Sequence, residues 1–143
     1  MMTWFKEKFL PWVAFWALIV FMAANSKAHA GDWDTQDKIN EAIYQTSHFV
    51  DTLQTIEIGK MRRGDGSYRY CEVESDFAMG HEPRVGTALA YMGTVAITHA
   101  LITHALIAND APKWATRSWQ YATIGWSVAH VAHNYSVGIR ISF

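Results

Sequence analysis

Residues 85–109 read VGTALAYMGTVAITHALITHALIAN, and residues 118–139 read SWQYATIGWSVAHVAHNYSVGI. Neither stretch contains an Asp, Glu, Lys or Arg residue. A helix needs about 20 residues to cross the hydrocarbon core of a bilayer, at about 1.5 Å of rise per residue. The two stretches therefore predict membrane-spanning helices over 85–108 and 118–139.

The connection between these helices reads Asn109-Asp110-Ala111-Pro112, which is a short turn by composition. It predicts that the two helices form a C-terminal antiparallel hairpin. Each helix also carries small residues one turn apart, such as Gly86 and Ala90 or Gly125 and Ala129. Small residues at this spacing let two helix backbones approach closely in lipid.

The N-terminal residues 1–30 resemble a secretory signal. Lys6 and Lys8 precede the apolar residues 9–24, and Ala28-His29-Ala30 supplies small residues two positions apart. A basic start, a short apolar core and such a site are typical of a bacterial signal peptide. The alternative is a retained N-terminal anchor helix. In either case residues 31–143 would form a helical membrane domain.

Residues 35–58 predict a third helix, capped by Asp34 or Thr35 and stopped at Gly59. Apolar or small residues follow one helical face, and Glu41, Gln45, Asp51 and Gln54 follow the other. The helix either lies on the membrane surface or spans the bilayer with its polar face towards partner helices. The bases at residues 60–63 favour the spanning placement, because they would then be cytoplasmic.

Together these segments predict an all-α fold, a small membrane helical bundle of three or four helices in the bacterial inner (cytoplasmic) membrane. The 143 residues suffice for one compact unit. The net charge of −1 and the lack of a basic stripe argue against nucleic acid as a partner. Cys71 is the only cysteine, so no intrachain disulfide can form. The expected partners are membrane lipid and a protein in the membrane.

Four histidines lie in the two apolar stretches, namely His99, His104, His130 and His133. Neutral imidazole is a good ligand for metals and for haem, so either cofactor is one interpretation. The other is that the imidazoles form hydrogen bonds between helices, because polar groups in lipid must be satisfied. No C-x-x-C-H haem attachment site is present. An acidic group between Glu72 and Glu82 could hold a divalent cation, or be a solvated loop.

The chain also resembles a diffuse group of short integral membrane proteins from bacteria and their phages. The resemblance covers about 51–143 and rests on Asp51-x-x-Gln54-Thr55, Glu74-x-Asp76-x-x-x-Gly80-x-x-Pro83, Arg117 and Asn134-x-x-x-Gly138. In that group the position of Asp76 is more often Asn. The resemblance implies a small helical membrane domain and a polar cluster of Asp51, Gln54, Thr55, Glu74, Asp76 and Asn134. It implies no reaction, because the group has no established activity.

The sequence therefore favours a non-enzymatic accessory or partner-binding membrane component. One alternative is a metal- or haem-binding membrane protein that uses the four histidines. Another is an intramembrane enzyme built around Asp51, Glu74 and His81. A last alternative is a phage lysis-type pore former, although residues 139–143 lack the charged tail expected of one.

Overall fold

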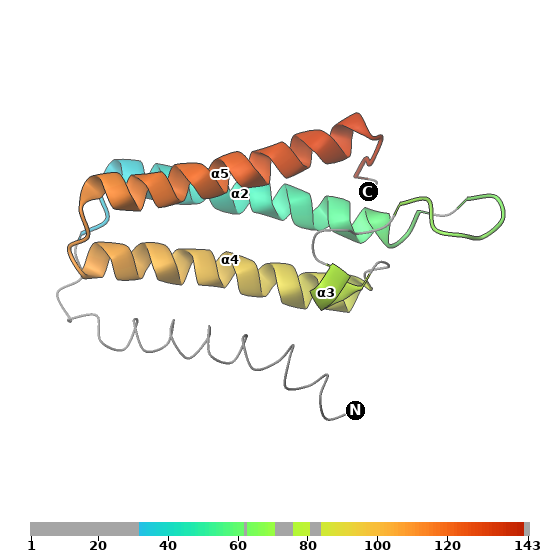
Figure 1. Cartoon of the computed structure of the whole chain (residues 1–143), viewed down its shortest axis with the longest axis horizontal. Coiled ribbons are helices and arrows are strands. Elements are labelled where there is room, and N and C mark those ends of the chain that lie inside the picture. The colour runs from blue at the N-terminus through green and yellow to red at the C-terminus, as the bar shows by residue number, and fades with distance from the viewer. Residues whose placement is uncertain (1–31, 62, 71–75, 81–83, 142–143) are drawn as a thin grey trace, which may run out of the picture.

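The computed structural model describes residues 32–61, 63–70, 76–80 and 84–141. Over these residues the chain is all-helical, with α2 (Thr35–Ile58), α3 (Asp76–Met79), α4 (Val85–Ala108) and α5 (Lys113–Ser136). The three long helices form a bundle (Figure 1). The start of α2 and the α4–α5 connection lie at one end, and α3 and the C-terminus lie at the other. The predicted signal or anchor, 1–30, lies outside the described residues.

The start of α2 is fixed by a reciprocal capping box. The Asp34 carboxylate accepts a hydrogen bond from the Asp37 backbone N–H at 2.8 Å, and the Asp37 carboxylate accepts one from the Asp34 N–H at 3.3 Å. These bonds satisfy N–H groups that have no partner inside the helix. Gly59 follows the last residue of α2, in a right-handed conformation. The helix thus occupies the range 35–58 indicated by its periodicity.

Both α4 and α5 end in a left-handed residue. Asp110 has φ 53° and Gly138 has φ 95°. The N–H groups of Ala111 and Ile139, one residue later in each case, donate back to carbonyls of the last helical turn at 2.9 Å. This is the Schellman arrangement, which satisfies the free carbonyls at a helix end. It ends α4 abruptly and so keeps the connection to α5 short.

The last helix begins earlier than the charge-free stretch suggests. α5 starts at Lys113, directly after Pro112, and not at Ser118. Lys113 and Arg117 lie in its first turns, where they pair with acids at the start of α2. The charge-free residues therefore mark only part of the helix. The helix extends further towards its N-terminus because the charges of Lys113 and Arg117 are paired with Asp37 and Asp34. Its last residue, Ser136, is three positions before the expected end at residue 139.

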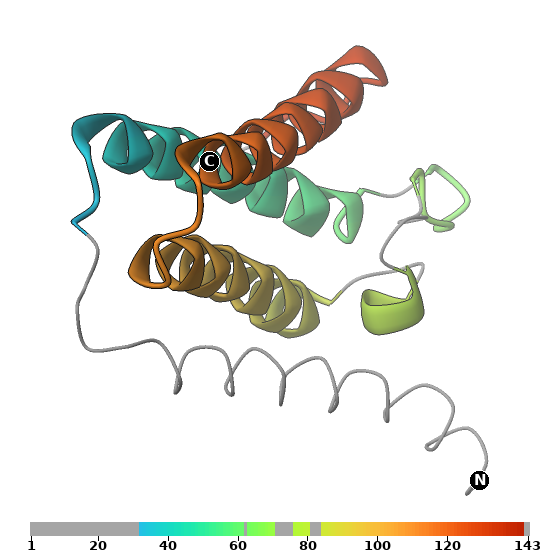
Figure 2. The same cartoon turned by 60° about the vertical axis from the view of Figure 1, so that its left-hand side comes forward.

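α2 packs against both of the other long helices, and most extensively against α5. α2 and α5 run in the same direction, and α4 runs in the opposite one (Figure 1). Figure 2 shows α4 and α5 diverging from their short connection. α2 contacts α5 at separate levels, at Asn40–Gln120 and at Asp51–Asn134. The side-chain hydrogen bonds that join α4 to α5 lie in the half of each helix next to the connection, at His99–Thr123 and Thr103–Trp119. A cavity lies between α4 and α5, with α2 on its third side.

The interior of the bundle is mainly polar. The largest fully buried side chains are Gln54, Gln120, Asn40, Thr103, Thr116 and Asp37. Buried apolar side chains are spread along the helices, and one cluster of them, Ile56, Met79 and Ala88, joins α2, α3 and α4. Large apolar side chains are instead found outside, and Ile97, Phe49 and Trp126 are each more than 60% exposed. This distribution is the reverse of that in a water-soluble bundle.

Candidate functional site

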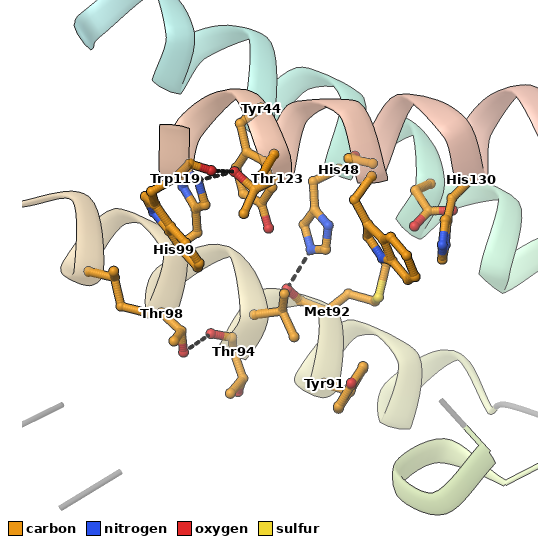
Figure 3. A pocket seen from close by; sticks show the side chains of 16 residues that line it. Tyr44, His48, Tyr91, Met92, Thr94, Thr98, His99, Trp119, Thr123 and His130 are labelled. Atoms are coloured by element: carbon orange, nitrogen blue, oxygen red, sulfur yellow. Dashed lines mark hydrogen bonds between the residues drawn. The ribbon is translucent and has the colours of Figure 1, made fainter. Parts of the chain in front are cut away.

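The middle of the bundle contains four stacked rings contributed by all three long helices (Figure 3). Tyr44 and His48 lie one turn apart on α2, with ring centroids 5.5 Å apart. The His99 ring of α4 lies 3.5 Å from Tyr44 on a nearly parallel plane, and Trp119 of α5 lies 5.3 Å beyond His99. The interplanar angles of the three contacts are 9°, 16° and 20°. We call these four residues the ring stack; it joins α2, α4 and α5 at one level.

His99 forms polar contacts through both ring nitrogens. Its Nδ1 lies 3.3 Å and 3.1 Å from the two carboxylate oxygens of Glu41, and its Nε2 lies 2.8 Å from the Thr123 hydroxyl. The same hydroxyl lies 2.9 Å from two backbone carbonyls of α5. A hydroxyl has one hydrogen to donate. When Thr123 donates to a carbonyl, His99 must therefore donate from Nε2.

The Glu41–His99 contact ties the middle of α2 to α4, and the His99–Thr123 contact ties α4 to α5. The Tyr44 and Trp119 rings both stack against the His99 ring. His99 therefore contacts both of the other long helices through its ring nitrogens and through its ring faces.

A cavity of about 570 Å³ lies beside the ring stack, between α4 and α5 and against α2. The lining includes Tyr44 and His48 from α2, Tyr91 and Thr98 from α4, and Trp126, Ser127 and His130 from α5. His48 is fixed on this wall, because its Nε2 donates to the Met92 carbonyl at 2.9 Å. A carbonyl only accepts, so the hydrogen of a neutral His48 is on Nε2 and its Nδ1 is an acceptor.

The polar cluster implied by the resemblance is present in part. The Asn134 amide donates to Asp51 Oδ1 at 3.1 Å and to Gln54 Oε1 at 3.3 Å. Thr55, on the same helix as Asp51 and Gln54, is also buried. The cluster therefore joins α5 to α2 near the α3 end of the bundle. Glu74 and His81, and the side chain of Asp76 in α3, lie outside the described residues.

The four predicted histidine ligands do not converge. His99 contacts Glu41 and Thr123, whereas His104 accepts from the Trp33 indole at 3.5 Å. His130 packs against Trp126, with ring centroids 4.8 Å apart, and His133 is exposed. Among the described residues no three His, Cys, Asp or Glu side chains form a group that could hold a metal ion.

An ion-pair group closes the end of the bundle at the α4–α5 connection. Lys113 Nζ lies 2.8 Å from Asp37 Oδ2, and Arg117 Nη2 lies 2.9 Å from Asp34 Oδ2. Asp37 is fully buried, so its charge requires these cations. The backbone N–H of Asp37, followed by the Lys113 and Arg117 cations, lowers the pKa of the Asp34 carboxyl to about 2.

Several of these residues were not candidates on sequence grounds. Tyr44 and His48 belong to the ring stack and Thr123 bonds to it, yet none of the three was part of a motif recognised in the sequence. One signal was available, because Asp37, Glu41, Tyr44, His48 and Asp51 follow the three- and four-residue spacing of one face of α2. Comparisons with protein-family models, with curated proteins and with solved structures find no match to this chain. What the site does must therefore be inferred from its chemistry.

Proposed function

We propose that this protein is an integral protein of the bacterial inner membrane with a non-enzymatic, partner-binding role. The observation that carries the proposal is the reversed polarity of the bundle. From Ile39 to Ile58 the exposed residues of α2 are Ile39, Ala42, Ile43, Thr46 and Phe49. The buried positions of the same segment include His48, Asp51, Gln54 and Glu57. Lipid is the solvent that suits an uncharged exterior around a hydrogen-bonded interior.

The exposed residues of the other two long helices are also suited to lipid as the surrounding solvent. The exposed residues of α4, such as Leu89 and Ile97, are all uncharged, and so are those of α5 between Ser118 and Ala132. α4 is the one helix of the described residues that is long and apolar enough to cross a membrane by composition alone. α2 and α5 are more polar in composition, and several of their polar residues bond to each other across the interface between the two helices. Each helix has 24 residues, and this length rises about 36 Å.

The distribution of basic residues supports an orientation. Among the described residues, the end of the bundle that carries α3 and the C-terminus has Lys60, Arg63, Arg69, Arg84 and Arg140. The opposite end has Lys38, Lys113 and Arg117, of which the last two pair with Asp34 and Asp37. By the positive-inside tendency, the first end faces the cytoplasm. In this arrangement α2, α4 and α5 all cross the bilayer and the α4–α5 connection lies outside.

A partner-binding role is supported by an exposed face of α4. Gly86, Ala90 and Gly93 follow one side of this helix, and no atom of the described residues would meet a Cβ added at either glycine. A second membrane helix could approach the α4 backbone closely there. In the described part of the chain, Glu41 pairs with His99 and Asp51 with Asn134, which is typical of polar contacts between helices. The non-enzymatic role is therefore the one we adopt.

Membrane extraction and thiol labelling test the proposal. The protein should remain in the membrane pellet after washing with carbonate at high pH and should dissolve in detergent. Cys71 should resist a membrane-impermeant maleimide in intact cells and react after lysis, whereas Cys71→Ser/Asp110→Cys should react in intact cells. Release by carbonate, or labelling of both positions from the same side, would contradict the spanning arrangement.

Affinity capture from native membranes tests the role. A reproducible membrane partner should be recovered with the wild-type protein and lost with Gly93→Leu, which fills the exposed face of α4. Thr46→Leu, at an exposed position of α2, is the matched control and should retain the partner. Recovery of no partner, or equal recovery with both variants, would count against an accessory role that uses this face.

A further inference from the structure

We infer that the cavity beside the ring stack binds a neutral, planar aromatic alcohol of the phenol or quinol class, taken up from the lipid phase. The first reason is its size and walls. A volume of about 570 Å³ is within the range of small-molecule sites, roughly 300–1,000 Å³. The walls include the flat rings of Tyr44, Tyr91, Trp119 and Trp126. Such walls favour a planar aromatic guest over a branched or flexible one.

The second reason is a hydroxyl that has no partner. Ser127 is 4% exposed and lines the cavity, and its Oγ has no hydrogen-bond partner among the described residues. Thr52, Thr98 and Thr103 behave differently, because each donates to a carbonyl four residues earlier, at 2.7–3.0 Å. The Thr116 hydroxyl also lacks a partner among the described residues, but Thr116 does not line the cavity. A buried hydroxyl without a partner is destabilising. Ser127 is therefore able to bond a polar atom of a guest.

The third reason is the chemistry of the opposite wall. On the α2 side the cavity is lined by His48, whose Nδ1 is an acceptor, and by Asp51. The His48 Nδ1 and an Asp51 carboxylate oxygen are acceptors on this wall, and they suit a guest that donates a hydrogen, as an aromatic hydroxyl does. Ser127 on α5 can donate to an oxygen of the same guest. Donor and acceptor groups on two walls, separated by aromatic faces, match a ring that carries one or two hydroxyls. A water molecule would satisfy Ser127 and leave the aromatic walls unfilled.

Equilibrium dialysis tests this inference with the full chain in lipid nanodiscs, after subtraction of the uptake by empty nanodiscs. The probes are 1-naphthol and naphthalene, which share a ring system and differ in the hydroxyl. We expect 1-naphthol to bind about tenfold more tightly, in keeping with two added hydrogen bonds. Ser127→Ala should weaken the binding of 1-naphthol by roughly three- to tenfold and leave naphthalene unchanged.

A second pair of variants tests the location. Ala122 and Ala132 are both exposed on α5, but only Ala122 lines the cavity. Ala122→Phe should abolish the uptake of 1-naphthol, and Ala132→Phe should preserve it. Helical content measured by circular dichroism verifies that each variant is folded. Equal affinity for the two probes would indicate an apolar site for lipid chains and overturn the inference. Unchanged binding in a folded Ala122→Phe variant would overturn it as well. Neither result would bear on membrane insertion, which carbonate extraction measures separately.

Discussion

The buried amide pair between α2 and α5 allows a quantitative test of the polar interior. Gln120 is fully buried; its Oε1 accepts from the Asn40 amide at 3.0 Å and its Nε2 donates to the Asp37 carbonyl at 3.1 Å. Gln120→Met keeps the length of the side chain and removes both bonds. The variant leaves the buried Asn40 amide without its acceptor and the buried Asp37 carbonyl without the donor from Gln120. Because each such group costs about 1–3 kcal/mol, we expect the free energy of unfolding to fall by about 2–3 kcal/mol.

A double-mutant cycle separates the pair from its surroundings. Asn40→Leu removes the donor that Gln120→Met leaves unsatisfied, so the double variant should be more stable than the sum of the single changes by about 1–2 kcal/mol. The assay is reversible unfolding in mixed micelles by increasing the fraction of denaturing detergent, followed by circular dichroism. The claim that interhelical amide bonds hold α2 to α5 would be refuted if each single variant lost less than about 0.5 kcal/mol of stability and the two losses simply added. The comparison value is the average hydrogen bond between membrane helices, about 0.6 kcal/mol.

Two other regions give predictions of opposite kinds. A backbone hydrogen bond and neighbouring cations lower the pKa of Asp34 to about 2. The ionised Asp34 therefore contributes fully to folding stability above its ordinary pKa of about 3.9, and this contribution is lost as the pH falls from about 4 to 2. Stability measured between pH 5 and pH 2 should therefore decline less steeply in Asp34→Asn than in the wild type, and parallel curves would contradict this. Gly138→Ala should destabilise the protein by roughly 1–2 kcal/mol, because the φ of Gly138 is 95° and an added Cβ would lie 3.3 Å from the Tyr70 hydroxyl. The matched control Gly93→Ala, in the open interior of α4, should stabilise by about 0.5–1 kcal/mol, and a loss of stability in both or in neither would contradict the reasoning.

The helical segments could be predicted because their signals are local. The 3.6-residue period and the cap at Asp34 indicate α2, and the lack of charge between residues 85 and 109 indicates α4. The start of α5 could not be predicted in the same way. Whether a lysine at residue 113 extends the helix or precedes it depends on the acids of α2, which lie more than 70 residues away in the chain.

The site was less predictable, because it depends on the rotation of each helix about its own axis. The periodicity of α2 separates a polar face from an apolar one, but a sequence does not state which face meets the neighbours. The four histidines of α4 and α5 therefore left two interpretations open, a ligand group and hydrogen bonds between helices. In the structure His99 contacts Glu41 and Thr123, and His104 contacts Trp33. The contact between Asp51 and Asn134 follows from the motif that the resemblance supplied, and the pairing of Glu41 with His99 had no such signal.

In the membrane arrangement that we propose, the polar face of α2 has a consequence for how the bundle assembles. An isolated α2 would place Glu41, His48 and Asp51 against lipid, where each ionisable group is costly. In the bundle the same groups contact α4 or α5, through His99, the Met92 carbonyl and Asn134. α4 carries no Asp, Glu, Lys or Arg between Val85 and Ala108, and its exposed residues are all uncharged. α4 is therefore suited to enter the bilayer alone, whereas α2 depends on α4 and α5 for its polar partners. These contacts recur along the length of α2, so they fix its register: a shift along the neighbouring helices would separate Glu41 from His99 and Asp51 from Asn134. The polar interior thus specifies one arrangement of helices where apolar packing alone would permit several.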